Sequence, residues 1–432
     1  MNVTPTTASA AVAATAATAA GRMPLKSLDD ALAELLAQAM PLDLVETVFT
    51  FDADARVLAS DLLSCLDVPA HDNSSMDGYA VRSADCGQAG AVLRVSQRIA
   101  AGSMGLPLEP GTAARIFTGA PIPTGADAVV MQEDCLALDT AAGSSPEIRL
   151  QALPRPGQWV RRRGEDVAAG EVVLARGARL TPASLGLAAS IGFGSLQVAA
   201  RVRVALFSTG DELVMPGEVA PGDMKPGAIY NSNRFFLRAL LLRLGCTVTD
   251  FGIVPDRRDA TIAALQGASR QHDLILTSGG VSVGEEDHIK PAVQALGELK
   301  LWQIAIKPGK PFAYGTVSGA HFIGLPGNPV SSFVTFLLLV RPFILALLGS
   351  NESPLATPFL LRADFDWPKA DRRREFLRVK QNLSGGLDLF SNQSSGVLNS
   401  AVWGDGLVDN PPGQVIARGD LVRFVAFSSL MA

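Results

Sequence analysis

The sequence is poor in residues that build disulfide frameworks and metal clusters. Its 432 residues include only four cysteines, which are far apart and form no C-x-x-C pair, and four histidines that are similarly scattered. Reduced thiols without a disulfide or zinc framework are typical of a cytoplasmic protein, so we expect a cytoplasmic location. Because the histidines are scattered, we expect no histidine-based metal site. The residues are Cys65, Cys86, Cys135, Cys246, His71, His272, His288 and His321.

A surplus of basic residues is also missing. The net charge is −5 and the sequence pI is near 5.5, which argues against a nucleic-acid partner. Any anionic substrate must therefore be held by local positive groups. The longest apolar run, at 333–348, is interrupted by Arg341 and Pro342. It is shorter than the roughly 20 residues that a membrane span needs, so we expect a buried helix there and no membrane association.

Several motifs of common enzyme classes are absent. The chain has no G-x-G-x-x-G, no Walker lysine after a glycine loop, no G-x-S-x-G and no defensible Ser/His/Asp order. Hydride transfer, P-loop hydrolysis and serine hydrolysis are therefore poorly supported. The first 20 residues are almost wholly Ala, Thr and other small residues without a basic region, which predicts a disordered tail, with a transit peptide as the alternative.

The composition and periodicity that are present predict several domains. With 48% hydrophobic and 18% charged residues, the chain is typical of a well-buried protein too long for one core. Leucines at helical spacing occupy 24–39, with Ser27 as the expected N-cap and Pro41 as the end. A mainly β region with frequent Gly and Pro turns then extends to about residue 163. Its expected strands lie at 92–99, 113–117, 128–131 and 147–153, and a helix follows at 182–191.

From residue 201 the pattern changes to alternating strands and helices, which predicts a doubly wound parallel sheet. The expected strands lie at 202–207, 247–254, 274–277 and 321–325, and the helices at 231–244, 258–267, 288–296 and 333–348. After residue 351 short β-like runs predict a small barrel, at 359–365, 375–379, 387–390 and 414–427.

Residues 273–311 carry the clearest candidate site. An apolar strand leads directly into Thr277-Ser278-Gly279-Gly280, where a parallel sheet binds its ligand and glycines let backbone N–H groups approach an anion. The acids at 285–287 have the wrong sign to hold a phosphate, so a bridging Mg²⁺ is the natural partner. Lys307 and Lys310 follow on a Pro-stiffened loop and provide charges for a second anion. This stretch predicts a site for a phosphorylated ligand and a metal.

Four further motifs contain candidate residues. Glu212, in Ser-Thr-Gly-Asp-Glu, follows a strand of the same sheet and suits Mg²⁺ or a ribose hydroxyl. Asn328, in Pro-Gly-Asn-Pro, begins a helix at that edge. Asp77 lies in Ser-Met-Asp-Gly-Tyr, which is either a hairpin turn or a carboxylate offered to a metal or an amine. Thr118 is either an anion donor or part of a Pro-rich connector.

Eight motifs, taken in their order along the chain, resemble those of one family, the molybdopterin molybdenumtransferases. Gephyrin carries a domain related to this family. The resemblance covers the chain from about residue 25 to the C-terminus. The motifs are Ser-Met-Asp-Gly-Tyr-Ala, Thr-Gly-Ala-Pro-Ile-Pro, Arg-Gly-Glu-Asp-Val, Ser-Thr-Gly-Asp-Glu-Leu, Ile-Tyr-Asn-Ser-Asn, Thr-Ser-Gly-Gly-Val-Ser-Val-Gly, Lys-Pro-Gly-Lys-Pro and Gly-Leu-Pro-Gly-Asn-Pro-Val-Ser.

The resemblance implies an α/β multidomain fold and a homodimer. Its parts would be a disordered tail, a helical domain in two segments, an inserted β-rich domain, a doubly wound molybdopterin-binding sheet domain and a C-terminal β-barrel. The corresponding residues here are 1–24, 25–45 with 165–200, 46–164, 201–349 and 350–432.

The resemblance also implies a reaction, in which adenylylated molybdopterin and molybdate, with Mg²⁺, give molybdenum cofactor and AMP. Carried over by motif, Asp77, Thr118, Glu212, Asp287, Lys307 and Lys310 would be catalytic, and Asp287, Asp77 and Glu212 would hold the metal. Asp77 and Thr118 would come from the partner subunit. The ligand contacts would be Thr277, Ser278, Gly279, Gly280, Ser282, Gly284, Pro311, Pro326, Gly327, Asn328, Arg374 and Ser395.

Some alternatives stay open at this point. The sheet domain alone resembles that of molybdopterin adenylyltransferase, and a non-enzymatic scaffold or carrier is the third possibility. The adenylyltransferase and chaperones of molybdoenzymes are open as protein partners. One departure from the family is Asp405, a negative charge where the family often has Ala-Asn-Gly, in the domain expected to help bind an oxyanion.

Overall fold

The computed structural model describes residues 25–138, 145–254, 257–280 and 288–431. The expected tail at 1–24 and the residues Ser282, Gly284 and Asp287 lie outside these ranges. By internal contacts the chain forms two compact units. The first contains Met1–Glu46, Ala55–Val57 and Val198–Ala432, and the second contains Thr47–Asp54 and Leu58–Gln197.

The first unit is built on a six-stranded sheet in the order β16-β13-β17-β21-β20-β18. The four strands β16, β13, β17 and β21 pair in parallel, as predicted, whereas β20 runs antiparallel to both of its neighbours. The bounds are β13 Arg203–Thr209, β16 Thr247–Val254, β17 Leu274–Ser278, β18 Gly297–Gln303, β20 Pro311–Val317 and β21 Ala320–Leu325.

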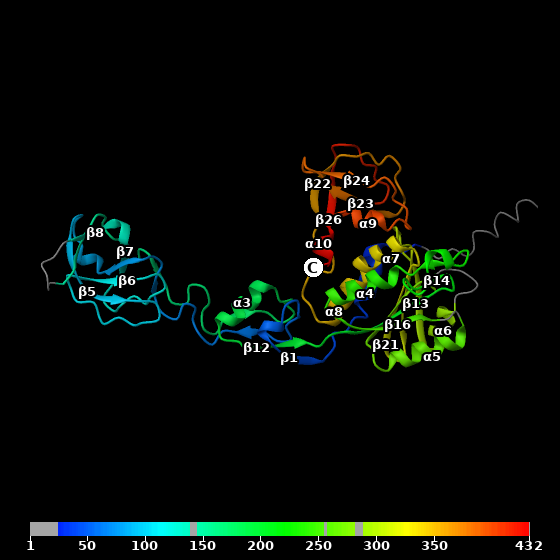
Figure 1. Ribbon diagram of the computed structural model, residues 1–432, viewed down its shortest axis with the longest axis horizontal. Helices are drawn as coiled ribbons and strands as arrows, with labels where there is room; N and C mark the ends of the chain where they lie inside the picture. Colours follow the sequence, from blue (N-terminus) through cyan, green and yellow to red (C-terminus); the bar gives the residue numbers. More distant parts are fainter. Residues whose placement is uncertain (1–24, 139–144, 255–256, 281–287, 432) are drawn as a thin grey trace, which may run out of the picture. The chain divides into compact units, whose positions relative to one another are not determined.

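Helices cover both faces of this sheet (Figure 1). The helices α5 and α6 pack on one face with Phe207, Ile275 and Phe322, and α4 and α7 pack on the other with Leu206, Leu276 and Ile323. Consecutive strand residues point to opposite faces, so each buried strand contributes to both cores. The bounds are α4 Asn233–Arg243, α5 Arg258–Ser269, α6 Ile289–Leu296 and α7 Pro329–Thr335.

The longest apolar helix, Pro329–Leu347, is long and apolar enough to cross a membrane, but 89% of its apolar window is buried inside the protein, as in a core helix. It comprises α7, a π-helical segment η5 (Phe336–Val340) and α8 (Arg341–Leu347). The irregular segment lies just before Pro342, which lacks the N–H that a regular helix would use. The N-terminal helix α2 (Leu28–Leu36) packs against α8 and begins at Ser27, whose hydroxyl accepts a hydrogen bond from Asp30 N.

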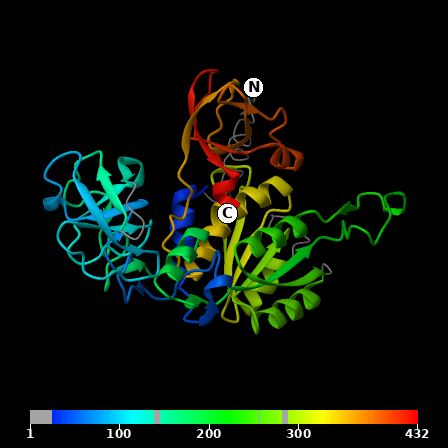
Figure 2. The ribbon, with the colours of Figure 1, turned by 60° about the vertical axis from the view of Figure 1, so that its left-hand side comes forward.

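The C-terminal residues form a closed five-stranded barrel (orange to red in Figure 2). The strands pair in the ring β23-β24-β22-β26-β25, and β25 returns to pair with β23. A short strand, β19 (Ile306–Lys307), adds to β23 in parallel and joins the barrel to the sheet domain. The bounds are β22 Phe359–Ala363, β23 Arg374–Gln381, β24 Gly386–Leu389, α9 Asn399–Trp403, β25 Gly406–Asn410, β26 Leu421–Ala426 and α10 Phe427–Met431.

The second unit contains a six-stranded sheet in the order β7-β4-β6-β5-β9-β8, with a buried cluster on each face. The β-rich region expected from its turn residues is therefore confirmed. Its elements are η1 Thr50–Asp52, β2 Leu62–Leu63, β3 Asn73–Ser74, β4 Gly78–Val81, η2 Ser83–Asp85, β5 Val92–Ile99, β6 Thr112–Ile116, β7 Ala128–Met131, η3 Gln132–Asp134, β8 Cys135–Leu138, β9 Glu147–Leu150, β10 Val160–Arg161, β11 Val172–Leu174 and α3 Pro182–Ser190.

The remaining short elements are β1 Val45–Phe49 and β12 Ser195–Ala199, at the passages between the units, and β14 Leu213–Val214, η4 Pro221–Asp223 and β15 Ile229–Tyr230 in the first unit. The strands that were not predicted include β4 and β8 of the second unit and β18, β20 and β25 of the first. The finer five-part division of the chain stays a prediction.

Candidate active site

The predicted ligand edge is formed where three neighbouring parallel strands end. The strand order reverses between β13 and β17, which is the position where open α/β sheets bind their ligands. The loops after these strands are in close contact, because a Cβ atom added to Gly279 would lie 2.9 Å from Thr209 O and one added to Gly327 would lie 3.9 Å from the Gly279 Cα. The structure thus brings together Gly279, Gly280 and Gly327.

Asn233, in the first turn of α4, fixes this edge. Its Nδ2 donates hydrogen bonds to Ser278 Oγ at 2.8 Å and to Gly327 O at 2.7 Å. One buried amide therefore joins the end of β17 to the loop after β21. Asn233 is the last residue of the Ile-Tyr-Asn-Ser-Asn motif.

Several buried hydroxyls at this edge have no hydrogen-bond partner within the described ranges. They are the hydroxyls of Ser208, Thr209 and Thr277, each on a residue at most 8% exposed. Buried hydroxyls are normally satisfied, so this set is suited to donate to the oxygens of a bound anion. The carboxylate of Glu212 lies against Gly210, at the same strand end.

Replacing Gly279 with Ala should lower both stability and ligand binding. Gly279 has φ +95° and meets Thr209 O, so the variant adds steric overlap to a left-handed backbone. We expect a loss of about 1–3 kcal/mol in the free energy of unfolding, measured with urea. Gly319→Ala is the matched control, because Gly319 has φ +94° with nothing within 4 Å. An equal effect of the two substitutions would contradict the close approach of the loops.

A second group of predicted residues packs on α7. Val330 N donates to Ser395 O at 2.9 Å, and a Cβ atom on Gly309 would overlap the Thr335 hydroxyl. Val330 and Thr335 are five residues apart, roughly 7–8 Å along a helix. The Lys-Pro-Gly-Lys loop and the Ser395 segment therefore converge on one short helix. That helix begins next to Gly327 and Asn328, so the phosphate edge and this second group are neighbours.

The two lysines of the loop differ in their surroundings. The Lys307 ammonium lies 3.0 Å from Glu375 Oε1 and 3.4 Å from Asp371 Oδ2, so it is already paired. Lys310 is exposed, and its ammonium has no carboxylate partner within the described residues. Lys310 is thus the lysine that is free to meet an incoming anion.

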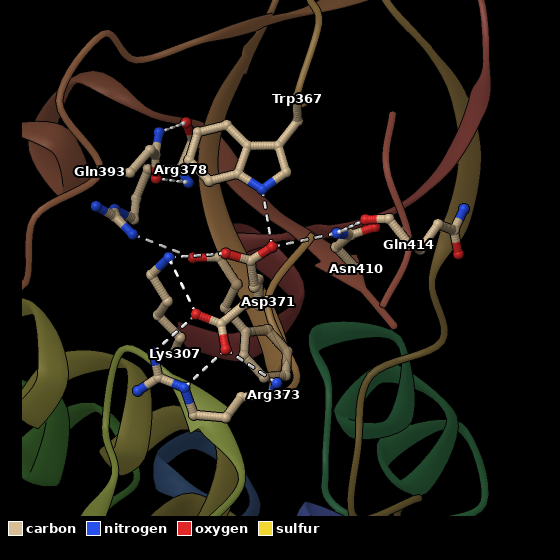
Figure 3. Close-up of polar contacts among 10 residues, drawn as sticks. Lys307, Trp367, Asp371, Arg373, Arg378, Gln393, Asn410 and Gln414 are labelled. Atoms are coloured by element: carbon tan, nitrogen blue, oxygen red, sulfur yellow. Dashed lines mark hydrogen bonds and ion pairs between the residues drawn. The ribbon is translucent and has the colours of Figure 1, made fainter. Parts of the chain in front are cut away.

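The arginine expected beside Ser395 is not the one that lies there. Arg374 points to Asp409, at 2.5 and 2.7 Å, and to Asp29 at 3.0 Å. Arg378 instead donates to Ser394 O at 3.3 Å, and also to Phe376 O and to the Ser400 hydroxyl. The geometry therefore favours Arg378 over Arg374 as the guanidinium of this site. Figure 3 shows Arg378 and Lys307 in the same region of the barrel.

Arg378 is a buried cation without a counter-ion within the described residues. It is 1% exposed, its hydrogen bonds go only to neutral oxygens, and burial lowers its pKa to about 10. It is still charged near neutral pH. A buried charge without a paired charge is unfavourable, so the site is electrostatically prepared for an anion.

Comparison with known proteins gives the family. Residues 26–192 match the MoeA N-terminal region (domain I and II), 205–346 a probable molybdopterin binding domain, and 361–427 the MoeA C-terminal region (domain IV). A molybdopterin molybdenumtransferase of Haemophilus influenzae is 42% identical over 353 residues, which is 82% of this chain and 85% of that protein. The chain belongs to the molybdopterin molybdenumtransferase family.

Other relatives agree with this assignment. Molybdopterin molybdenumtransferase 2 of Mycobacterium tuberculosis is 36% identical, over 88% of this chain and 93% of that protein. The solved structure of the molybdopterin biosynthesis moeA protein from Pyrococcus horikoshii OT3 superposes with a TM-score of 0.80 at 27% identity, and the match covers 93% of this chain and 100% of that one. The chain is therefore an enzyme, a transferase of molybdenum cofactor biosynthesis, with the multidomain fold that its motifs implied.

The family motifs of the second unit also form a defined pair. Asp77 Oδ1 accepts hydrogen bonds from Thr118 N at 2.8 Å and from the Thr118 hydroxyl at 2.7 Å. The bond from Thr118 N, more than any other cause, lowers the pKa of Asp77, which keeps this exposed carboxylate ionised. Among the described residues no three His, Cys, Asp or Glu side chains cluster as a complete metal site.

The departure from the family at Asp405 lies away from Lys307. Its carboxylate accepts a hydrogen bond from Gln381 N at 3.0 Å, at the end of β23. Gln381 is six residues from Glu375 along the strand, roughly 20 Å away. Asp405 therefore fixes the far end of a barrel strand and does not add negative charge beside Lys307.

Proposed function

We propose that this enzyme inserts molybdate into adenylylated molybdopterin in a Mg²⁺-dependent reaction that releases AMP and yields molybdenum cofactor. The observation that carries the proposal is the presence of two anion-suited sites beside α7. One is the glycine-rich edge of the sheet, with its unpartnered hydroxyls, and the other contains the buried, unpaired Arg378.

The edge of the sheet suits the phosphate and adenylyl groups of the substrate. The Gly279 N–H already donates to Leu325 O at 3.1 Å, which joins the loop to β21. The N–H of Gly280 can approach an anion because this residue has no side chain in the way, and the hydroxyls of Ser208, Thr209 and Thr277 can donate to the anion's oxygens. Pro326, Gly327 and Asn328 lie directly before α7, whose N-terminus faces the same edge. Ser282 and Gly284 extend this set in the proposal.

The second site suits a doubly charged oxyanion. Lys310 offers a free ammonium, Arg378 a buried guanidinium, and Ser395 and Pro311 lie on the adjoining segments. Such charges act by holding molybdate close to the pterin dithiolene, so the protein contributes positioning and electrostatic stabilisation, with little covalent chemistry.

The residues present fit a bound Mg²⁺. This ion prefers oxygen ligands and is usually held by one or two carboxylates together with substrate phosphates. We propose three carboxylates as its ligands: Glu212, which lies next to Gly210 after β13, together with Asp287 and Asp77. When bound, Mg²⁺ would neutralise the phosphate charge and favour departure of AMP.

Three wider proposals follow from family membership. We propose a homodimer in which the Asp77–Thr118 pair of one subunit completes the cleft of the other. We also propose a cytoplasmic location, in agreement with the unpaired cysteines. The adenylyltransferase that supplies the substrate and the chaperones of molybdoenzymes are the protein partners to test.

The deciding experiment measures AMP release from adenylylated molybdopterin by the purified protein with Mg²⁺, with and without molybdate. We expect AMP release that requires molybdate, together with cofactor able to activate an apo-molybdoenzyme. Binding of the adenylylated intermediate without turnover would instead support a carrier or scaffold. Formation of the intermediate from molybdopterin and ATP would support an adenylyltransferase.

A further inference from the structure

Lys307 lies in a network of alternating charges where the barrel meets the sheet domain (Figure 3). Its ammonium is bonded to Glu375 at 3.0 Å and lies 3.4 Å from Asp371. Asp371 in turn accepts two side-chain hydrogen bonds from Arg373, at 2.9 and 2.8 Å, and one from Arg373 N at 3.0 Å. Two cations and two carboxylates therefore neutralise one another.

This arrangement is unfavourable for a dianion at Lys307. A doubly negative oxyanion next to the ammonium would also meet both carboxylates at close range, and like charges at such distances repel strongly in partly buried surroundings. Arg373 lowers the pKa of Asp371 well below its usual range, mainly through its side-chain hydrogen bonds, so ordinary acidification does not neutralise this carboxylate. One carboxylate must move before the oxyanion can bind there.

Glu375 is held in place. Its side chain is 1% exposed, and besides Lys307 it accepts hydrogen bonds from Trp367 Nε1 at 2.8 Å and Asn410 Nδ2 at 3.4 Å. It also lies in β23, opposite Lys307 in the β19–β23 pairing. Glu375 can therefore keep one hydrogen of the ammonium in position while the other two remain available for a ligand.

Asp371 is the carboxylate that can leave. It precedes β23 in a segment without helix or strand, its side chain is 21% exposed, and its distance to Lys307 is the longer of the two. Its carboxylate lies between an ammonium and a planar guanidinium. That is a geometry in which oxyanions are bound, because the guanidinium fork donates two parallel hydrogen bonds.

We propose that Asp371 is a built-in competitor of the oxyanion substrate. Its carboxylate occupies the anion position between Lys307 and Arg373, and molybdate binds by displacing it, while Glu375 holds Lys307 in place in both states. This proposal rests on the proposed function. It adds Arg373 as a further oxyanion contact and Asp371 as a residue that sets the affinity for the anion.

The test is titration calorimetry of the full-length protein with sodium molybdate, comparing wild type with Asp371→Asn. We expect the variant to bind molybdate about five- to tenfold more tightly, the effect of removing one nearby like charge from a partly exposed site. A residue that only supports the fold, or a direct ligand, would weaken binding when replaced, so a gain in affinity excludes both of these roles for Asp371. Asp371→Ser, which has a smaller side chain, should give the same gain.

Asp388→Asn is the matched control. It removes the same charge from the same barrel. Asp388 pairs with Lys380 across the β23–β24 ladder, and Lys380 is five residues after Glu375 in β23, or roughly 16 Å along the strand. The Asp388→Asn variant should bind molybdate with the same affinity as wild type. If wild type binds molybdate and both Asp371 variants bind it equally or more weakly, the proposal that Asp371 competes is wrong, and the proposed function is unaffected. Absence of molybdate binding in every protein would remove the proposed function as well.

Discussion

Replacing Arg378 with Met should raise the molybdate concentration needed for AMP release while changing the stability of the protein little. The guanidinium is buried, lacks a counter-ion within the described residues and donates only to neutral oxygens. A hydrogen bond to a charged partner contributes about 1.5–3 kcal/mol, so molybdate affinity should fall roughly 10- to 100-fold. Removal of a buried charge without a counter-ion also removes its desolvation cost, and this gain opposes the loss of its three hydrogen bonds in the free energy of unfolding. Calorimetry with molybdate and urea unfolding measure the two effects.

Arg374→Met is the matched control, with the opposite expectation. Arg374 pairs with Asp409, which is 3% exposed, so its loss leaves a buried carboxylate with only the Arg423 guanidinium at 3.2 Å. We expect this variant to lose stability, by roughly 1–3 kcal/mol, and to keep most of its molybdate affinity. If Arg374→Met instead lost molybdate binding and Arg378→Met kept it, the assignment taken from the sequence motif would be restored.

Replacing Lys310 with Ala should raise the molybdate concentration needed for half-maximal AMP release without changing stability. The ammonium is exposed and carries no carboxylate partner in the described part of the chain, so its removal leaves no unpaired charge behind. Loss of one charge-assisted contact corresponds to about 1.5–3 kcal/mol, or a rise of roughly 10- to 100-fold. Steady-state kinetics at varied molybdate and a thermal unfolding curve check the prediction.

Lys225→Ala serves as the control for general electrostatic attraction, because Lys225 is an exposed lysine of the same unit outside the site. It should have wild-type kinetics. An equal effect of the two substitutions would mean that the oxyanion responds only to net charge. A scaffold would tolerate loss of Lys310 without any change in its binding partners, so this variant also separates that alternative from the enzyme.

Most secondary structure could be predicted because local patterns specify it. Strands β5, β7 and β16 begin and end where alternating or apolar runs predicted, and α2 begins at its Ser27 cap. Several unpredicted strands begin with a Gly or Pro residue that indicates a turn when considered alone, such as Pro311 at the start of β20. Neighbouring strands β18 and β21 provide the pairing that stabilises β20, and a local pattern does not contain that information.

The phosphate edge could also be predicted from the sequence. Motifs that end parallel strands of one sheet must meet at the same edge, so the strand pattern alone places Gly279, Gly280 and Gly327 together. The hydrogen bonds of Asn233 to two of these loops confirm that the edge is one assembly.

Only the tertiary structure distinguished the charged residues of the second site. Arg374 and Arg378 are four residues apart on one strand, and because side chains alternate with a period of two, the sequence places both on the same face. Their roles are decided by Asp409 and Asp29 for Arg374 and by Ser394 and Ser400 for Arg378, which are distant in sequence. In the same way, Lys307 and Lys310 look equivalent in their motif, but Glu375 and Asp371 from the barrel neutralise only Lys307. The sequence by itself determined which elements and motifs form the site, because these depend on local periodicity. The state of each charge depends on partners that long-range packing brings within a few ångströms, and only the tertiary structure decided it.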